Sequence, residues 1–302
     1  MTAPEGIVVL GVPRSGTTLL QRLLDAHPRI AAPAETYLLA ACGRFLAAER
    51  TATGLEVGVE AGLAFAGFDR EEVIDRLRAL VFGLLAEHAR RAGAARWAEK
   101  STFGVFHLDA VERLCADRVL FVVLHRHGLD VATSLVELSG RTGRFLGELH
   151  PWVARWPSLL EAFARLWADR TRALLDLSNR AGVRAVAVRY EDLVRAPEAE
   201  LARVLEPVGE TVADRMVVSA LRDAGAVGLG DWKVFERDRV DDASIDRWKG
   251  LPRVEIARLA PLVSPLLAEL GYEPVEVDPA EDDDPQRRHR LAQLLAAART
   301  RP

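Results

Sequence analysis

The feature that most constrains this chain is the run IVVLGVPRSGTTLLQRLLDAHP (residues 7–28), where a glycine-bounded turn joins a strand pattern to a helix pattern. Such a turn points backbone N–H groups and the positive end of a helix dipole at one anion. Gly11 and Gly16 fit the G-x-x-x-x-G-K-[ST] pattern of ATP-binding loops, but Thr17 replaces the lysine and Thr18 takes the Ser/Thr place. The run predicts a phosphate site for a nucleotide whose transferable group is not a γ-phosphoryl.

The side chains of this turn support the same prediction. Arg14, Ser15, Thr17 and Thr18 supply one cation and three hydroxyl donors around a short, diphosphate-like group. The alternative is a purely structural turn that binds no phosphate, in which the hydroxyls cap the following helix.

Apolar runs that alternate with longer helical patterns indicate the fold class. Strands are expected at residues 6–10, 95–99, 118–124 and 183–188, and helices at residues 17–26, 36–49, 71–92, 105–115, 129–138, 158–181, 197–208, 212–223 and 253–270. This order predicts a three-layer α/β fold, a parallel sheet flanked by helices, whose ligands bind beyond the carboxyl ends of the strands. We expect one domain over residues 1–275 and a charged tail, with a basic, solvated or loosely docked helix, over residues 276–302.

A second motif, FVVLHRHGLDVATSL (residues 121–135), follows the expected central strand. Arg126 leaves the strand end, Asp130 suits the first turn of a helix, and Ser134 lies one turn further along. Arg126 and Ser134 are therefore candidates for a second phosphate, against the alternatives of a surface ion pair and a solvated serine. His125 and His127 flank the arginine, and we interpret both as structural rather than as metal ligands or acid/base groups.

A third motif, AVRYEDLVRAPEAELARVLEPVG (residues 187–209), places Tyr190 at the carboxyl end of a strand. A tyrosine there can stack on a nucleotide or form a hydrogen bond with it. Glu191 and Asp192 are expected to cap and orient the backbone rather than to perform chemistry.

Composition narrows the class of protein. The 302 residues are 49% hydrophobic, which suffices for a full core. The 40 basic and 44 acidic side chains leave a small negative net charge, which argues against nucleic acid as the main partner. Cys42 and Cys115 lack CxxC spacing, and no zinc pattern is present. A signal-peptide pattern and an apolar run of membrane-spanning length are both absent from the sequence. We expect a cytoplasmic protein that uses no metal.

Together these motifs resemble the sulfotransferases that use 3′-phosphoadenosine 5′-phosphosulfate (PAPS), especially bacterial members related to tyrosylprotein sulfotransferases. The resemblance covers about residues 7–272 and includes VPRSGTTLL, R-x-x-x-D-x-x-x-S and YEDL. It implies the P-loop NTPase-like sulfotransferase fold. It also implies that residues 14–18 hold the 5′-phosphosulfate, that Arg126 and Ser134 hold the 3′-phosphate, and that Tyr190 contacts the nucleotide.

The same resemblance suggests the chemistry. Glu35 matches the glutamate base of tyrosylprotein sulfotransferases, and its alternative is a carboxylate favoured by a helix start. Lys100 matches the lysine of W-x-x-K-[ST]-P segments, although the proline is Phe103 or absent here. With Arg14, it would assist departure of the nucleotide. Ser101 and Thr102 occupy the places where cytosolic sulfotransferases carry a histidine base, which leaves His107 as a distant second to Glu35.

Further assignments concern the late part of the chain and the acceptor. Lys233, in GLGDWKVFERDRVDDASIDRWKGL (residues 228–251), is a candidate nucleotide contact, with a solvated loop as its alternative. Tyr37 stands where tyrosylprotein enzymes carry an arginine, so a small-molecule hydroxyl is favoured over a peptide as acceptor. Residues 49–68 and 149–159, with His150, Trp152 and Trp156, are expected to recognise it. An ATP-dependent P-loop phosphotransferase and a noncatalytic nucleotide-binding scaffold remain the alternatives.

Overall fold

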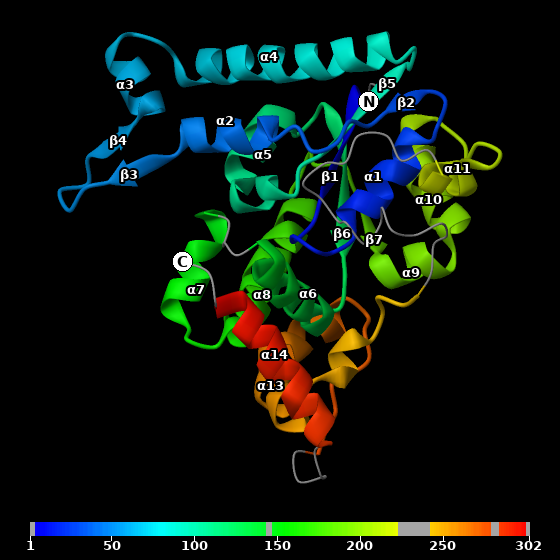
Figure 1. Cartoon of the computed structure of the whole chain (residues 1–302). Helices are drawn as coiled ribbons and strands as arrows, with labels where there is room; N and C mark the ends of the chain where they lie inside the picture. The colour runs from blue at the N-terminus through cyan, green and yellow to red at the C-terminus, as the bar shows by residue number, and fades with distance from the viewer. Residues whose placement is uncertain (1–3, 143–146, 223–241, 279–283, 300–302) are drawn as a thin grey trace. The chain divides into compact units, whose positions relative to one another are not determined.

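The computed structural model describes residues 4–142, 147–222, 242–278 and 284–299 (Figure 1). Within these ranges the chain forms two compact units. The sheet unit comprises residues 4–11, 16–124 and 174–222, and the helical unit comprises residues 12–15, 125–142, 147–173, 242–278 and 284–299. The chain passes from one unit to the other between Ser15 and Gly16, inside the glycine-bounded turn.

The sheet unit is built around five strands in the order β2-β5-β1-β6-β7. The strands are β1 (Gly6–Leu10), β2 (Ile30–Ala31), β5 (Arg96–Lys100), β6 (Val119–His125) and β7 (Ala185–Arg189). β1 pairs in parallel with β5 and β6, and β2 pairs in parallel with β5. Every residue of β1 and β6 is buried, which explains why both read as unbroken apolar runs rather than alternating ones.

Helices cover both faces of this sheet. Because successive side chains of a strand point to opposite faces, two contacts of β5 assign the layers. Trp97 packs against Phe82 of α4 (Arg70–Arg91), with ring centroids 5.1 Å apart, whereas Lys100 reaches Thr18 of α1 (Thr17–Asp25). α5 (Leu108–Cys115) packs with α4, and α11 (Met216–Arg222) packs with α1. The predicted three-layer α/β fold with a parallel sheet is confirmed.

The segment after α2 (Leu38–Leu46) differs from the expected long helix over residues 36–49. It forms an antiparallel hairpin of β3 (Ala48–Arg50) and β4 (Glu56–Gly58), followed by α3 (Val59–Phe65) (Figure 1). The hairpin turn is local: Leu55 N donates to Thr51 Oγ1, and Gly54 adopts a left-handed φ of 82°. The chain becomes extended at Ala47, directly after α2, and the polar turn residues close the hairpin.

The remaining elements of the sheet unit follow β5 and β7. They are η1 (Phe103–Phe106), α9 (Tyr190–Arg195), α10 (Pro197–Leu205) and η3 (Glu206–Val208). Pro197 opens α10, as expected for a residue without a backbone N–H at the first helical position.

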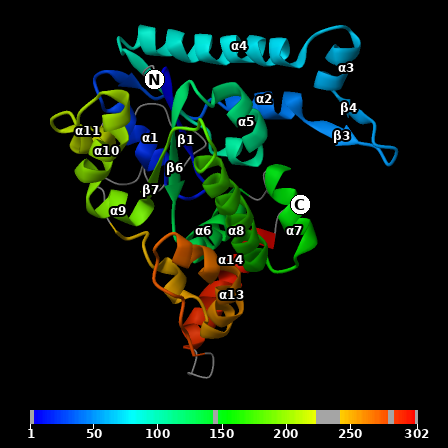
Figure 2. The same cartoon turned by 180° about the vertical axis from the view of Figure 1, so that it is seen from behind.

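The helical unit contains the segment that follows β6. Its elements are α6 (Gly128–Thr142), η2 (Gly147–Leu149), α7 (His150–Arg155), the first part of α8 (Leu159–Ser178), η4 (Arg247–Gly250), α13 (Arg253–Glu269) and α14 (Pro285–Arg299). α14 is the basic helix expected in the tail. It packs against α6 (Figures 1 and 2). A Cβ at Gly140 would lie 3.2 Å from the Ala297 Cβ, and most of the α14 side chains are exposed.

Among the helices of the described residues, none combines the length and the apolar character needed to cross a bilayer.

The close packing of β1 on β5 yields a test of the sheet unit. A Cβ at Gly6 would lie 2.4 Å from the indole of Trp97, which is buried, so Gly6→Ala should lower the free energy of unfolding by about 1–3 kcal/mol. Gly83, in the middle of α4, has open space around it, so Gly83→Ala should raise the same free energy by about 0.5–1 kcal/mol through helix propensity. Urea unfolding of both variants measures the difference. Shifts of the same sign would contradict the packing described here.

Candidate functional site

The glycine-bounded turn needs both of its glycines. A Cβ at Gly11 would lie 2.9 Å from the Leu124 carbonyl oxygen and 3.0 Å from Thr17 Cγ2. Gly16 has a φ of 100°, and a Cβ there would lie 2.3 Å from the ring of Tyr190. Tyr190, the first residue of α9, is buried and lies directly after β7, so the tyrosine predicted at a strand end packs its ring on the turn itself.

Three of the predicted phosphate ligands meet in the helical unit. Arg14 Nε donates to Ser134 Oγ at 3.1 Å, and Arg126 Nη1 donates to the Arg14 carbonyl oxygen at 2.9 Å. Arg126 Nη2 donates to the Ser244 carbonyl oxygen at 2.5 Å. Arg14 adopts a left-handed φ of 76°, a conformation that costs a residue with a Cβ about 1–2 kcal/mol and that surrounding contacts must hold. The buried Ser15 Oγ has no hydrogen-bond partner among the described residues and so offers a hydroxyl at the same turn.

Asp130, which the sequence assigns to the first turn of a helix, has a second role. Its Oδ2 accepts a hydrogen bond from Asp246 N at 3.0 Å, and its Oδ1 accepts one from Trp248 N at 2.9 Å. His127 stacks on the Trp248 ring with centroids 4.9 Å apart. Burial lowers the pKa of His125 and of His127 to about 4, so both rings are neutral at pH 7. This environment supports the structural interpretation of the two histidines.

In the sheet unit, Glu35 and Lys100 form a buried ion pair. Lys100 Nζ lies 3.3 Å from Glu35 Oε2, and the two side chains are only 4% and 10% exposed, respectively. Glu35 Oε1 also accepts a hydrogen bond from Phe103 N at 3.3 Å. Because the pair is buried, water and salt screen its charges only weakly, and these charges act strongly on any group bound beside them.

The ion pair adjoins the start of α1. Lys100 Nζ lies 3.5 Å from Thr18 Oγ1, and Thr17 Oγ1 lies 3.2 Å from Thr102 Oγ1. A carboxylate, an ammonium group and three threonine hydroxyls thus gather at a helix N-terminus, where the helix dipole favours anions. His107, the second candidate base, instead packs against α2, because a Cβ at Gly43 would lie 2.3 Å from the His107 Cβ.

Sequence reasoning missed Glu99 and Thr36. Glu99 is fully buried, and its Oε1 accepts a hydrogen bond from Thr36 Oγ1 at 2.7 Å. Desolvation raises the pKa of Glu99 to about 8, Glu35 adds to the rise, and Thr36 and Lys100 oppose it. The available signal was an acidic residue inside the buried strand RWAEK. Thr36 was expected to open a helix, but α2 begins at Leu38, which leaves the Thr36 hydroxyl to face Glu99.

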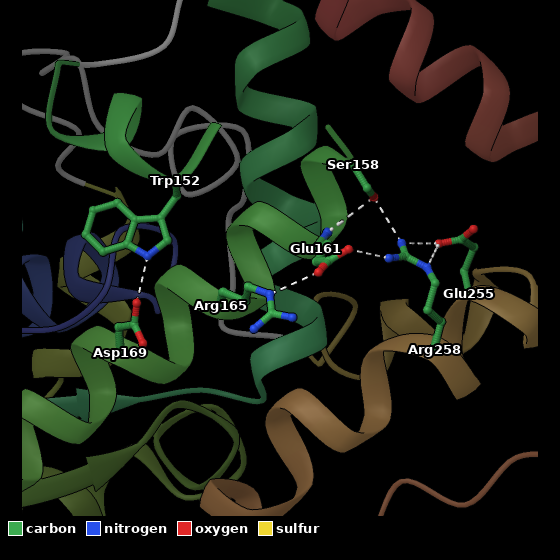
Figure 3. A network of polar contacts seen from close by, with 7 residues as sticks. All are labelled: Trp152, Ser158, Glu161, Arg165, Asp169, Glu255 and Arg258. Atoms are coloured by element: carbon green, nitrogen blue, oxygen red, sulfur yellow. Dashed lines mark hydrogen bonds and ion pairs between the residues drawn. The ribbon is translucent and has the colours of Figure 1, made fainter. Parts of the chain in front are cut away.

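The predicted acceptor segment 149–159 forms α7 and leads into α8. Trp152 Nε1 donates to Asp169 Oδ2 at 2.8 Å, and Arg165 bonds Glu161, which in turn binds Arg258 (Figure 3). The guanidinium of Arg165 lies over the Trp156 ring, with its Cζ 5.0 Å from the ring centroid. Both tryptophans are partly exposed and have polar or charged partners. Their role in acceptor recognition stays a prediction.

Two further predictions concern other parts of the chain. Lys233, with Trp232, Arg237 and Arg239, lies outside the described residues. Among the described residues, no group of three or more His, Cys, Asp and Glu side chains is arranged to hold a metal ion.

The buried carboxyl group of Glu99 makes stability depend on pH. In the folded chain Glu99 keeps its proton up to about pH 8, whereas its ordinary pKa is 4.5. Between these values the folded state binds more protons than the unfolded state, so the free energy of unfolding falls as pH rises. Glu99→Gln removes this loss, and the variant should gain stability over the native chain by up to about 1.4 kcal/mol per pH unit in this window.

Chemical unfolding at pH values from 5 to 8 measures this gain. Glu198→Gln, at an exposed carboxylate of α10, serves as the control and should track the native chain. A gain for Glu99→Gln that does not grow with pH would contradict a protonated Glu99.

Comparisons with known proteins show the family of the chain. Residues 4–214 match the model of the sulfotransferase family. The nodulation protein NoeE of Sinorhizobium fredii is 30% identical over 281 residues, which cover 88% of this chain and 65% of NoeE, so the chain spans less than two thirds of that relative. Protein-tyrosine sulfotransferase 1 of Danio rerio is 25% identical over 279 residues, 89% of this chain and 72% of the relative.

Solved structures share the fold. The sulfotransferase domain from the curacin biosynthetic pathway has a TM-score of 0.61 at 22% identity, covering 90% of this chain and 99% of that domain. The sulfotransferase domain of the Synechococcus PCC 7002 olefin synthase has a TM-score of 0.58 at 24% identity, covering 90% of this chain and 97% of the domain. With the family model matching well over half of its length, the chain belongs to the sulfotransferase family.

Proposed function

We propose that this protein transfers a sulfuryl group from PAPS to a hydroxyl group of a small-molecule acceptor, with Glu35 as general base. Family membership supports sulfuryl transfer by an O-sulfotransferase. The donor, the base and the acceptor class are the finer parts of the proposal.

The single observation that carries it is the buried Glu35–Lys100 pair beside the start of α1. The turn lacks the lysine that ATP-binding loops place on the β- and γ-phosphates. Lys100 brings a cation to the same helix start from β5, and it comes with a carboxylate. The absent loop lysine disfavours transfer of a γ-phosphoryl group, and the carboxylate beside Lys100 supplies the base that transfer to a neutral alcohol needs.

The proposed reaction is a direct in-line displacement. Glu35 accepts the proton of the acceptor hydroxyl as the acceptor oxygen forms its bond to sulfur. The bond between sulfur and the bridging phosphate oxygen breaks, and 3′-phosphoadenosine 5′-phosphate leaves with the electron pair. Lys100 and Arg14 would neutralise the charge that develops on the leaving oxygen, which is where a fixed cation lowers the barrier most.

The phosphate assignments follow from the family resemblance and the local contacts. Residues 14–18 are proposed to hold the 5′-phosphosulfate, because they combine backbone N–H groups at a helix start with Arg14 and three hydroxyls. Arg126 and Ser134 are proposed to hold the 3′-phosphate. In the helical unit Ser134 accepts a hydrogen bond from Arg14, and Arg126 donates to two carbonyl oxygens, so phosphate binding would exchange some of these contacts. Tyr190 is proposed to contact the nucleotide from its place on Gly16.

An apolar small molecule is the proposed acceptor. The hairpin and α3, within the predicted acceptor segment 49–68, carry exposed apolar side chains, among them Leu55, Val57 and Phe65. Such side chains favour an acceptor with apolar surface over an acidic peptide.

Glu35→Gln tests the base. The variant keeps an acceptor for Phe103 N but cannot take a proton, so turnover with PAPS and a panel of alcohols and phenols should fall by about 10²–10⁴-fold. Binding of 3′-phosphoadenosine 5′-phosphate, measured by calorimetry, should stay close to native. Glu198→Gln is the control at an exposed site. Unchanged turnover in Glu35→Gln would remove Glu35 from this role.

Ser134→Ala tests the 3′-phosphate assignment. Loss of a hydrogen bond to a charged phosphate should weaken binding of 3′-phosphoadenosine 5′-phosphate by about 10-fold or more, and binding of AMP, which lacks the 3′-phosphate, much less. Thr133→Val is the matched control, because the neighbouring Thr133 hydroxyl is also buried but bonds the Leu129 carbonyl within α6. Equal weakening for both nucleotides would contradict the assignment.

The same measurements separate the two alternative functions. Thermal stabilisation by ATP with magnesium, but not by the bisphosphate nucleotide, would indicate a P-loop phosphotransferase. Tight binding of the bisphosphate nucleotide without product from any acceptor would indicate a noncatalytic scaffold.

A further inference from the structure

Two neighbouring residues of one loop meet the last two residues of one strand. In the loop before α2, Glu35 pairs with Lys100, and Thr36 donates a hydrogen bond to Glu99. Glu99 and Lys100 end β5, and their side chains leave the strand toward opposite faces. The loop therefore contacts both sides of the strand end, and a large shift of Glu35 would break the Glu35–Lys100 or the Thr36–Glu99 contact.

The Thr36 hydroxyl also connects the end of β5 to the start of α2. The hydroxyl donates a hydrogen bond to Glu99 Oε1 at 2.7 Å. Its oxygen accepts a hydrogen bond at 3.2 Å from the backbone N–H of Leu38, the first residue of α2. Tyr37, between them, adopts a left-handed φ of 61°, which persists in a residue with a Cβ only where neighbouring contacts hold it. One hydroxyl therefore ties the strained start of a helix to a buried carboxyl group.

The Tyr37 ring adds a third contact on the same loop. It packs on the ring of Phe103, with centroids 5.7 Å apart, and Phe103 N donates to Glu35. All three consecutive loop residues, 35 to 37, are therefore held by the segment 99–103.

Packing alone does not explain a carboxyl group at position 99. Glu99 is fully buried, and its Oε2 has no hydrogen-bond partner among the described residues. An apolar side chain would avoid that cost. What the carboxyl group adds is an acceptor directed at Thr36. As a neutral acid, it supplies this acceptor without a second negative charge beside Glu35.

We propose that Glu99 is a positioning residue for sulfuryl transfer, which acts through the Thr36 hydroxyl to hold Glu35 against Lys100. The inference rests on the proposed function, because it assumes that Glu35 is the base. Neither Glu99 nor Thr36 is proposed to touch a substrate.

Four variants test the inference in matched pairs. Thr36→Val removes the hydroxyl and keeps the shape, whereas Thr36→Ser keeps the hydroxyl. Glu99→Leu removes the acceptor, whereas Glu99→Gln keeps it. Thr36 is only half-buried, so its variants should fold even if Glu99→Leu does not.

The expected result is a split between turnover and binding. Thr36→Val and Glu99→Leu should lower kcat by about 10–100-fold, the scale expected for a misplaced catalytic group, with the KM for PAPS unchanged. Thr36→Ser and Glu99→Gln should recover most of the lost turnover. The double variant Thr36→Val with Glu99→Leu should be no slower than the slower single variant, since both break one contact. Equal kcat for Thr36→Val and Thr36→Ser would overturn the proposal.

Amide hydrogen exchange at Leu38 gives a readout that does not depend on the reaction. Its N–H bonds the Thr36 hydroxyl, so exchange should be faster in Thr36→Val than in Thr36→Ser. If the native protein binds the nucleotide but transfers nothing, the proposed function fails, and the exchange comparison still decides whether Thr36 holds the loop. Equal exchange rates at Leu38 in the two variants would contradict the conclusion that the Thr36 hydroxyl holds the loop.

Discussion

The close approach at the glycine-bounded turn is the constraint on which the rest of the sheet unit depends. Gly11 lets the chain leave β1 against the backbone of β6, and Gly16 leaves room for the ring of Tyr190. Both contacts lie at distances that a Cβ would not allow. The end of β1, the start of α1 and the end of β7 therefore meet at one place, and the polar groups of several elements are directed at the same helix start.

Two opposite charges form an ion pair beside the start of α1. Lys100 supplies one buried positive charge, and Glu35 balances it as its ion-pair partner. A third ionised group at Glu99 would leave a net negative charge in a region with little water, and burial raises the pKa of Glu99 to about 8. Two carboxyl groups near one lysine can thus serve different purposes, one charged and one neutral, because their environments differ.

The helical unit shows a related use of polar groups around one turn. The segment between β6 and α6 binds backbone through Arg126 and Asp130, which together contact residues 14, 244, 246 and 248. Trp167 Nε1 donates to the Arg126 carbonyl oxygen at 3.1 Å, so the backbone of this turn is anchored as well. These contacts give Arg126 and Asp130 a structural role, so substitutions at either residue are expected to affect folding.

Local patterns determined the fold class and most of the candidate residues. Apolar runs indicated β1, β6 and β7, and the shorter run ARWAE indicated β5. The glycines with the polar residues between them indicated the turn, because all these signals reside in short stretches of chain. The hairpin after α2 was missed, because the helical pattern of the sequence continues past Leu46, where the chain becomes extended. Only the tertiary structure decided that Glu35 meets Lys100 and that Thr36 meets Glu99. Each of these contacts joins residues more than sixty positions apart, and which buried group pairs with which depends on how the strands lie beside one another, a property that no short stretch of sequence contains.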